Sequence, residues 1–250
     1  MQRIEVCDDM DLYLFPPAGR SNWGFNIYAL RDGNDVLLID SGYEPQAAEL
    51  LADLTARGLT PRRAVISHFH PDHIYGLRVL PKLEVWGSER YMETVGAFDP
   101  PEDAAVMTPS HCITDGETVT FGRFTLRFLL KRGHAASTVH TIINDTYIHI
   151  GDDLLATNDG HPILPWLPLD CAGEYAMSLE ALKEFADHTI LLSHGAEIRG
   201  RDAALEEIEN RRRYLAAVAA SDGHIPYLQA VAGCTRPFLH AEWHDKMYKR

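Results

Sequence analysis

Short apolar runs alternate with an amphipathic stretch in the first part of the chain. Residues 25–32 (FNIYALRD) and 35–40 (DVLLID) are rich in branched and aromatic side chains, which predicts two strands. Residues 44–58 (EPQAAELLADLTARG) carry apolar side chains at helical spacing, and residues 62–67 (RRAVIS) return to a strand pattern. This alternation predicts an α/β arrangement.

Further strands and then helices are predicted in the rest of the chain. The strand-like runs are 84–88, 117–122, 124–130, 138–145, 146–152 and 189–195. Residues 173–187 and 202–220 have helical spacing, and Asp202 is a suitable N-cap for the second helix. We expect a strand-rich domain over residues 1–200 and a helical C-terminal extension over residues 201–250 that packs on it.

Two long segments with prolines, 97–110 and 156–172, are predicted to be loops. They carry apolar side chains that suit either the walls of a substrate site or an interface between subunits. These side chains are Phe98, Met107, Ile163, Leu164, Trp166 and Leu167.

Composition limits the partners. A chain of 250 residues with 46% hydrophobic and 24% charged residues is typical of a globular protein, and no apolar run reaches the roughly 18 residues of a membrane span. The N-terminal residues are too acidic for a signal peptide, so we expect a cytoplasmic protein. The net charge of −13 argues against a nucleic-acid partner, although Arg211, Arg212 and Arg213 form a short basic run. The cysteines Cys7, Cys112, Cys171 and Cys234 are dispersed, which predicts small buried side chains and no cysteine metal site.

Histidines and an aspartate cluster directly after the predicted strand 62–67. His68 and His70 are separated by one residue and can point the same way, which suits one metal ion. Pro71 turns the chain, so that Asp72 and His73 project in another direction, which suits a second ion.

Two metal ions need more donors than these four residues. His134 follows strand 124–130, Asp152 lies at the end of strand 146–152, and His194 lies at the end of the strand that begins at residue 189. The neighbouring Asp153 is the alternative to Asp152. His140 and His149 lie inside predicted strands, where we expect them to have structural roles.

The motifs H-x-H-x-D-H, G-H, G-D and S-H-G, in this order from about Asp40 to Ala196, resemble those of the metallo-β-lactamase superfamily. The resemblance implies a four-layer αββα sandwich with a dinuclear site. His68, His70 and His134 would hold one ion, Asp72, His73 and His194 the other, and Asp152 would bridge them. It also implies that Asp40 orients a ligand. Residues 135–138 (AAST) depart from the Thr-Pro-Gly-Ser-like turn that usually follows the G-H motif.

The resemblance implies a hydrolase with two divalent ions, for which zinc is favoured and iron or manganese are alternatives. An oxygen held between the ions would attack a carbonyl carbon, and Asp72 is the candidate general acid or base. Residues 169–185 resemble the segment before the last histidine in glyoxalase II-like and lactonase-like members. We therefore expect a small substrate, an ester, thioester or lactone with an apolar group, and a possible homodimer. A phosphodiesterase, a single-iron sulfur dioxygenase and a metal-binding scaffold without turnover remain alternatives.

Overall fold

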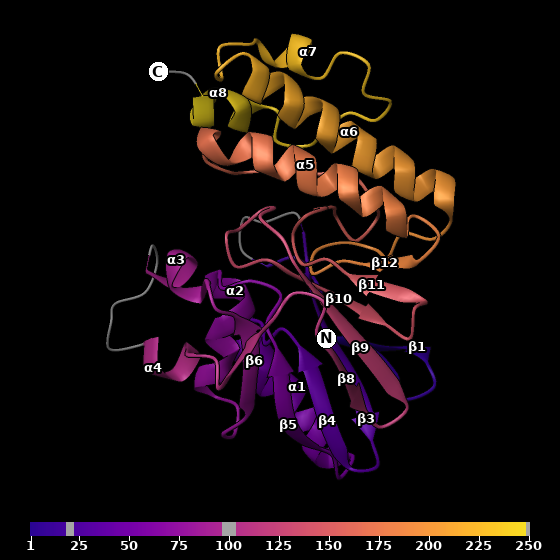
Figure 1. Ribbon diagram of the computed structural model, residues 1–250. Helices are drawn as coiled ribbons and strands as arrows, with labels where there is room; N and C mark the ends of the chain where they lie inside the picture. Colours follow the sequence, from indigo (N-terminus) through magenta and orange to yellow (C-terminus); the bar gives the residue numbers. More distant parts are fainter. Residues whose placement is uncertain (19–22, 97–103, 249–250) are drawn as a thin grey trace.

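The computed structural model describes residues 1–18, 23–96 and 104–248. Within these ranges the strands form two sheets that pack face to face, and helices cover both outer faces (Figure 1). The expected αββα sandwich is therefore confirmed.

The larger sheet contains, among the described residues, seven strands in sequence order. They are β1 Gln2–Cys7, β2 Met10–Phe15, β3 Phe25–Asp32, β4 Asp35–Ile39, β5 Thr60–Val65, β6 Glu84–Ser88 and β7 His111–Ile113. Strands β1 to β4 pair antiparallel, whereas β4 to β7 pair parallel. Because parallel neighbours end at the same edge, the segments that follow β4, β5 and β6 meet there.

The smaller sheet has the order β12-β11-β10-β9-β8 within the described part of the chain. Its strands are β8 Thr118–Phe121, β9 Phe124–Leu130, β10 Val139–Ile143, β11 Tyr147–His149 and β12 Thr189–Leu191. All neighbours pair antiparallel except β11 and β12, which pair parallel.

Three apolar clusters separate the four layers. One lies between the sheets and contains Tyr28, Phe124 and Phe128. Another lies between the larger sheet and helix α1 (Glu44–Ala56), and the third lies between the smaller sheet and helices α5 (Ala172–Leu182) and α6 (Arg201–Ala220). Strands β5, β11 and β12 end at one edge of the sandwich, and α5 contacts the turn that follows β11.

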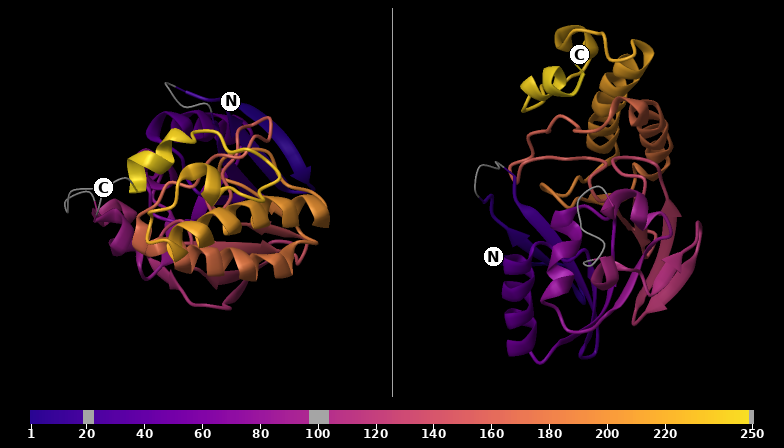
Figure 2. Two further views of the ribbon diagram at one scale, coloured as in Figure 1. Left: turned by 90° about the horizontal axis from the view of Figure 1, so that it is seen from above. Right: turned by 90° about the vertical axis from the view of Figure 1, so that its left-hand side faces the viewer.

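The remaining described helices are short. They are α2 Pro71–Ile74, η1 Tyr75–Arg78, α3 Tyr91–Val95, α4 Ala104–Met107, η2 Leu169–Cys171, η3 Lys183–Phe185, α7 Tyr227–Ala230 and α8 Glu242–Tyr248. Helices α5 and α6 lie side by side, with α7 and α8 at the same end of the molecule (Figures 1 and 2). No described helix is long and apolar enough to cross a membrane. The division at residue 200 stays a prediction.

The hairpin of β1 and β2 is not among the predicted elements. An acidic residue interrupts the apolar pattern of the hairpin, because Asp11 occupies a fully buried position in β2. Arg3 and Arg57 lie 3.2 and 2.9 Å from its carboxylate oxygens and compensate that burial.

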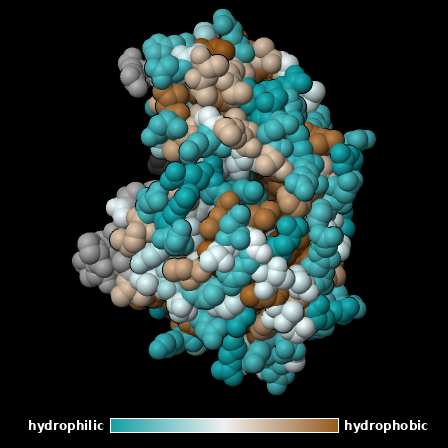
Figure 3. Space-filling model, viewed as in Figure 1, coloured by the Kyte–Doolittle hydropathy of each residue, from teal (hydrophilic) through white to brown (hydrophobic). Residues whose placement is uncertain are grey.

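The surface agrees with an acidic, charged chain. Hydrophilic residues cover most of the face seen in Figure 3, and hydrophobic residues form small separate patches there. The predicted basic run is not one exposed patch, since Arg211 is buried and pairs with Glu207 at 2.7 Å. The expectation of four buried cysteines is also wrong, because Cys112 is exposed and the other three are only partly buried.

Candidate metal centre

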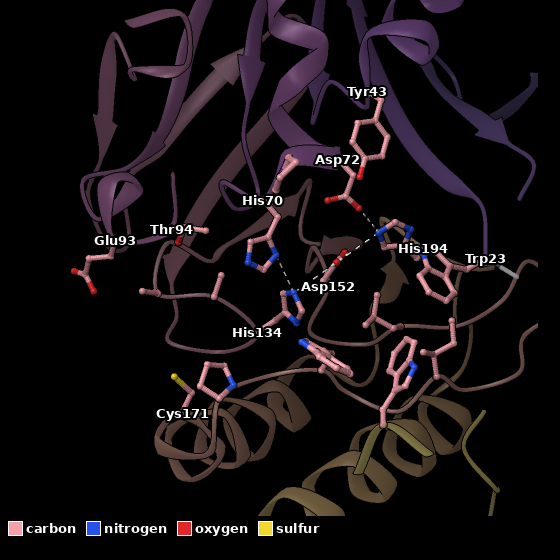
Figure 4. A pocket seen from close by; sticks show the side chains of 18 residues that line it. Trp23, Tyr43, His70, Asp72, Glu93, Thr94, His134, Asp152, Cys171 and His194 are labelled. Carbon is pink, nitrogen blue, oxygen red and sulfur yellow. Dashed lines mark hydrogen bonds and ion pairs between the residues drawn. The ribbon is translucent and has the colours of Figure 1, made fainter. Parts of the chain in front are cut away.

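The seven predicted donor residues come together at one edge of the sandwich. His68 and His70 follow β5, and Asp72 and His73 lie on α2, which begins with Pro71. Proline suits the first position of a helix, and it turns the chain here as expected. The smaller sheet supplies His134 after β9, Asp152 after β11 and His194 after β12. Figure 4 shows side chains from both sheets converging.

Three imidazoles form the first group. His70 Nδ1 lies 2.9 Å from His68 Nε2 and 3.1 Å from His134 Nε2. Burial lowers the pKa of His68 and His134 and lowers that of His70 to about 3. These rings are therefore neutral at pH 7 and keep the lone pairs that a metal ion requires.

The second group contains Asp72, His73, Asp152 and His194. His194 Nε2 lies 3.1 Å from Asp72 Oδ2 and 3.5 Å from Asp152 Oδ2. Burial would lower the pKa of His194, but Asp152 and Asp72 raise it to about 10. The other ring nitrogen, Nδ1, lies 2.6 Å from the carbonyl oxygen of Gly24, which fixes the orientation of the ring.

Asp152 faces both groups. One or other of its carboxylate oxygens lies 3.9 Å from His68 Nε2, 3.8 Å from His134 Nε2 and 3.4 Å from His73 Nε2. Burial would raise the pKa of Asp152, but His194 and His73 hold it well below its ordinary value. An anionic carboxylate thus lies between the two groups.

Asp40 is fully buried behind the second group. Its carboxylate accepts hydrogen bonds from Ser67 N and Ser67 Oγ, both 2.8 Å, and from Ser193 Oγ at 3.0 Å. His73 Nδ1 lies 2.8 Å from the same carboxylate. Burial would raise the pKa of Asp40, but His73 lowers it, so the acid fixes the ring with Nε2 directed at the other donors.

Asp153 points away from the donors and supports His134. Its Oδ1 accepts a 2.8 Å hydrogen bond from the backbone N–H of His134, and Oδ2 lies 2.8 Å from His140 Nε2. A Cβ on Gly133 would lie 2.1 Å from Asp153 Oδ1, so the position before His134 needs glycine. Gly151 has φ +56°, a conformation that side chains rarely adopt. These contacts account for the glycines of the G-H and G-D motifs.

His140 and His149 are outside both groups of donors. His140 supports Asp153, and His149 Nε2 lies 3.2 Å from Ser193 Oγ. Both side chains are buried within the smaller sheet, as expected for structural histidines.

A pocket of about 650 Å³ opens onto the two groups. Its walls are largely apolar, and no lysine or arginine is among the described residues that line it. Of the six predicted wall residues, only Ile163 and Trp166 line the pocket. Met107, Leu164 and Leu167 are buried in the apolar clusters that pack against the sheets, and Phe98 lies outside the described residues.

Several pocket residues have no counterpart in the sequence predictions. They include Trp23, Tyr43, Glu93, Thr94, Cys171 and Trp243. The one signal for these residues in the sequence is tryptophan, which is rare in the chain. Of its four tryptophans, all except Trp86 line the described pocket.

The residues present suit two divalent ions. His73 Nε2 and Asp152 Oδ1 are buried 3.4 Å apart, beyond the usual ~2.7–3.2 Å, and neither has a well-formed hydrogen bond to a described residue. Five imidazoles and two carboxylates form a donor set that zinc, iron and manganese accept. The buried polar atoms and the donor chemistry therefore both fit a metal centre.

A four-layer αββα sandwich with histidines and aspartates at one edge is typical of a class of proteins that bind metal ions at that edge. A family model described as "Metallo-beta-lactamase superfamily" matches residues 23–194. The chain belongs to this superfamily.

Solved structures share the fold. A metallo-beta-lactamase from Cronobacter sakazakii, a mutant of its HARLDQ motif, has a TM-score of 0.70 at 15% identity, with 90% of this chain and 100% of that chain covered. A beta-lactamase domain protein from Burkholderia ambifaria has a TM-score of 0.66 at 19% identity, with 88% and 78% covered.

Curated relatives match over a shorter region. A hydroxyacylglutathione hydrolase of Xanthomonas campestris is 30% identical over 148 residues, which are 58% of this chain and 51% of the relative. The human mitochondrial persulfide dioxygenase ETHE1 is 31% identical over 133 residues, 52% and 47% of the two chains. The chain thus matches about half the length of these relatives.

Proposed function

We propose that the protein is a metal-dependent hydrolase that cleaves an ester, thioester or lactone with an apolar substituent. One observation carries this proposal: potential metal ligands form one side of a pocket whose other walls are largely apolar. The names of the relatives agree with it, since a hydroxyacylglutathione hydrolase acts on a thioester.

We assign His68, His70 and His134 to one divalent ion and Asp72, His73 and His194 to the other, with Asp152 between them. Zinc is favoured, and iron and manganese are alternatives. Two such ions, when bound, polarise a carbonyl group and lower the pKa of water. The chain's own contribution is to hold the donors before the ions arrive, through Asp40 and Asp153.

Asp72 is the candidate proton carrier. Its side chain lines the pocket, and Tyr43, Asp72 and His194 follow one another along the same wall (Figure 4). Burial would raise the pKa of Asp72, but His73 and His194 hold it below its ordinary value. The carboxylate is therefore ionised at neutral pH and is able to accept a proton from attacking water.

A panel of substrates tests this function. It contains acyl thioesters, lactones, a β-lactam and a bis-aryl phosphodiester, each offered to protein loaded with zinc, iron or manganese. We expect the fastest hydrolysis for a carbonyl compound with an apolar group. Turnover of the phosphodiester alone would overturn the proposal, and no turnover with any metal would favour a binding scaffold.

A single-iron sulfur dioxygenase is the second candidate, because the human relative carries the name of a persulfide dioxygenase. Elemental analysis and oxygen uptake with a persulfide separate the two. One iron per chain together with oxygen consumption would favour the dioxygenase. A cytoplasmic location, the lack of a nucleic-acid partner and a homodimer stay predictions.

A further inference from the structure

Three tryptophans from distant parts of the chain form one wall of the pocket. Trp23 precedes β3, Trp166 lies in the segment before η2, and Trp243 lies on α8. The ring of Trp243 lies 5.8 Å from that of Trp23 and 5.4 Å from that of Trp166, at 88° and 89°. These are edge-to-face contacts, which stabilise aromatic clusters. Trp243 lies beyond the family-matched region, which ends at residue 194.

Buried contacts hold this wall in place. His244, next to Trp243, is buried, with its ring nitrogens 3.0 Å from Tyr214 Oη and 2.8 Å from the carbonyl oxygen of Ile225. His240 stacks on the Trp243 ring at 4.3 Å. The segment that bears Trp166 is joined to the C-terminal residues by backbone hydrogen bonds between Leu164 N and Leu239 O, 3.1 Å, and between Leu239 N and Pro162 O, 2.9 Å. A wall with such anchors changes little when a ligand binds.

Away from the metal donors, the described lining offers no basic side chain to an anionic group. No lysine or arginine lines the pocket within the described residues, and Glu93, the charged lining side chain outside the donor set, is acidic. Glu93 lies on the opposite side of the pocket from Trp23 (Figure 4) and pairs with Arg132 at 3.1 Å. Nothing described on the lining therefore matches the two carboxylates of a glutathione group.

A cation is also a poor match for the tryptophan wall. A cation binds over the open face of an aromatic ring. One face of Trp243 is covered by His240, which reduces the ring face that a cation could use. An uncharged aromatic ring suits such a wall, because it can make the same edge-to-face contacts.

We propose that Trp23, Trp166 and Trp243 bind an uncharged aromatic group of the substrate, and that the C-terminal helix α8 thereby sets specificity. This inference rests on the proposed hydrolase function. It narrows the substrate to an ester, thioester or lactone that has an aryl group near the scissile carbonyl and whose leaving group carries no carboxylate or phosphate.

Thioesters of N-acetylcysteamine provide the test, since this thiol is neutral. The phenylacetyl, cyclohexylacetyl and acetyl thioesters are compared with S-phenylacetylglutathione by release of the thiol. We expect kcat/KM to be highest for phenylacetyl-N-acetylcysteamine. In Trp243→Ala it should fall roughly tenfold for the phenylacetyl compound, through KM, and less than about twofold for the acetyl compound. Trp243→Phe should recover most of the loss.

Leu228→Ala is the matched control, because Leu228 is an exposed residue of α7 outside this pocket. It should leave all rates unchanged, and the bound metal should be the same in every variant. Equal losses for the phenylacetyl and acetyl compounds in Trp243→Ala would overturn the inference. So would a preference for the glutathione thioester or for a trimethylammonioacetyl thioester.

A ketone analogue, in which CH₂ replaces the sulfur of the phenylacetyl thioester, separates this inference from the proposed function. Calorimetric binding to wild type that weakens about tenfold in Trp243→Ala supports the aromatic wall even if no thioester is hydrolysed. Absence of binding to wild type overturns it, whatever the protein hydrolyses.

Discussion

The hydroxyl of Tyr175, on α5, donates a 2.6 Å hydrogen bond to the main-chain oxygen of Asp153. The same hydroxyl lies 3.3 Å from the main-chain oxygen of Asp152, and the ring is buried. An outer helix therefore fixes the turn from which Asp152 faces the donors and Asp153 supports His134. This contact gives a physical reason for a tyrosine in the segment before the last histidine.

Tyr175→Phe should destabilise the fold and loosen the turn. The buried carbonyl of Asp153 loses its donor, which typically costs about 1–3 kcal/mol. Urea unfolding measures this loss, and chelator competition measures metal affinity, which we expect to fall. Tyr91→Phe, a change in a ring that packs on Phe69, is the control and should alter stability by less than about 0.5 kcal/mol. Unchanged metal affinity in Tyr175→Phe would contradict the role assigned to the turn.

Neighbouring aspartates should respond differently to substitution. Asp152→Ala should abolish most activity and release at least one ion on dialysis, because no carboxylate between the ions then offsets the repulsion of two cations about 3.5–4 Å apart. Asp153→Asn keeps an oxygen that can accept from His134 N–H, so both ions should be retained. Elemental analysis of both variants decides the matter. The bridging role would move to Asp153 if the pattern were reversed.

Asp40→Asn should weaken metal binding without unfolding the protein. Asp40 has φ +63°, and asparagine tolerates this conformation better than most residues. The charge that holds His73 disappears, and loss of such a supporting group typically lowers metal affinity about 10–100-fold. Chelator competition measures the change. Asp35→Asn, in an exposed pair with Arg62, is the control, and equal affinities in the two variants would remove Asp40 from the site.

Protein purified without chelator should contain about two transition-metal ions per chain, as a bridged site requires. Dialysis against a strong chelator should remove them and lower the melting temperature, because an ion that binds the folded state stabilises it. Elemental analysis and thermal melts provide both readouts. A reproducible content of one ion or less would rule out the dinuclear assignment.

Arg211→Ala should destabilise the protein far more than Arg213→Ala. The Arg211 guanidinium donates hydrogen bonds to Glu207 and to the main-chain oxygen of Leu155, which lines the pocket. All three residues are buried. Removing one partner of a buried ion pair costs about 3–5 kcal/mol, whereas an exposed pair such as Arg213 and Glu209 contributes about 0–1 kcal/mol. Denaturant unfolding should show this difference, and equal losses would contradict it.

The donor set was predictable because each donor follows an apolar strand, and the ends of neighbouring strands meet in space. The tryptophan wall was not. Trp23 and Trp243 are far apart in the sequence, and only tertiary packing brings them together. Periodicity also did not separate Leu164 and Leu167, which face the core, from Trp166, which faces the pocket, because that segment has no regular secondary structure.

Each group of donors takes members from both sheets, with His68 and Asp72 following β5 of the larger sheet and His134 and His194 following strands of the smaller one. An ion in either group would thus join two layers that otherwise meet through apolar side chains over most of their area. It would act as a reversible cross-link between the two sheets at this edge. Metal loss should then let the sheets part first at this edge, so that limited proteolysis of the demetallated protein begins in the segments after β5 and β11.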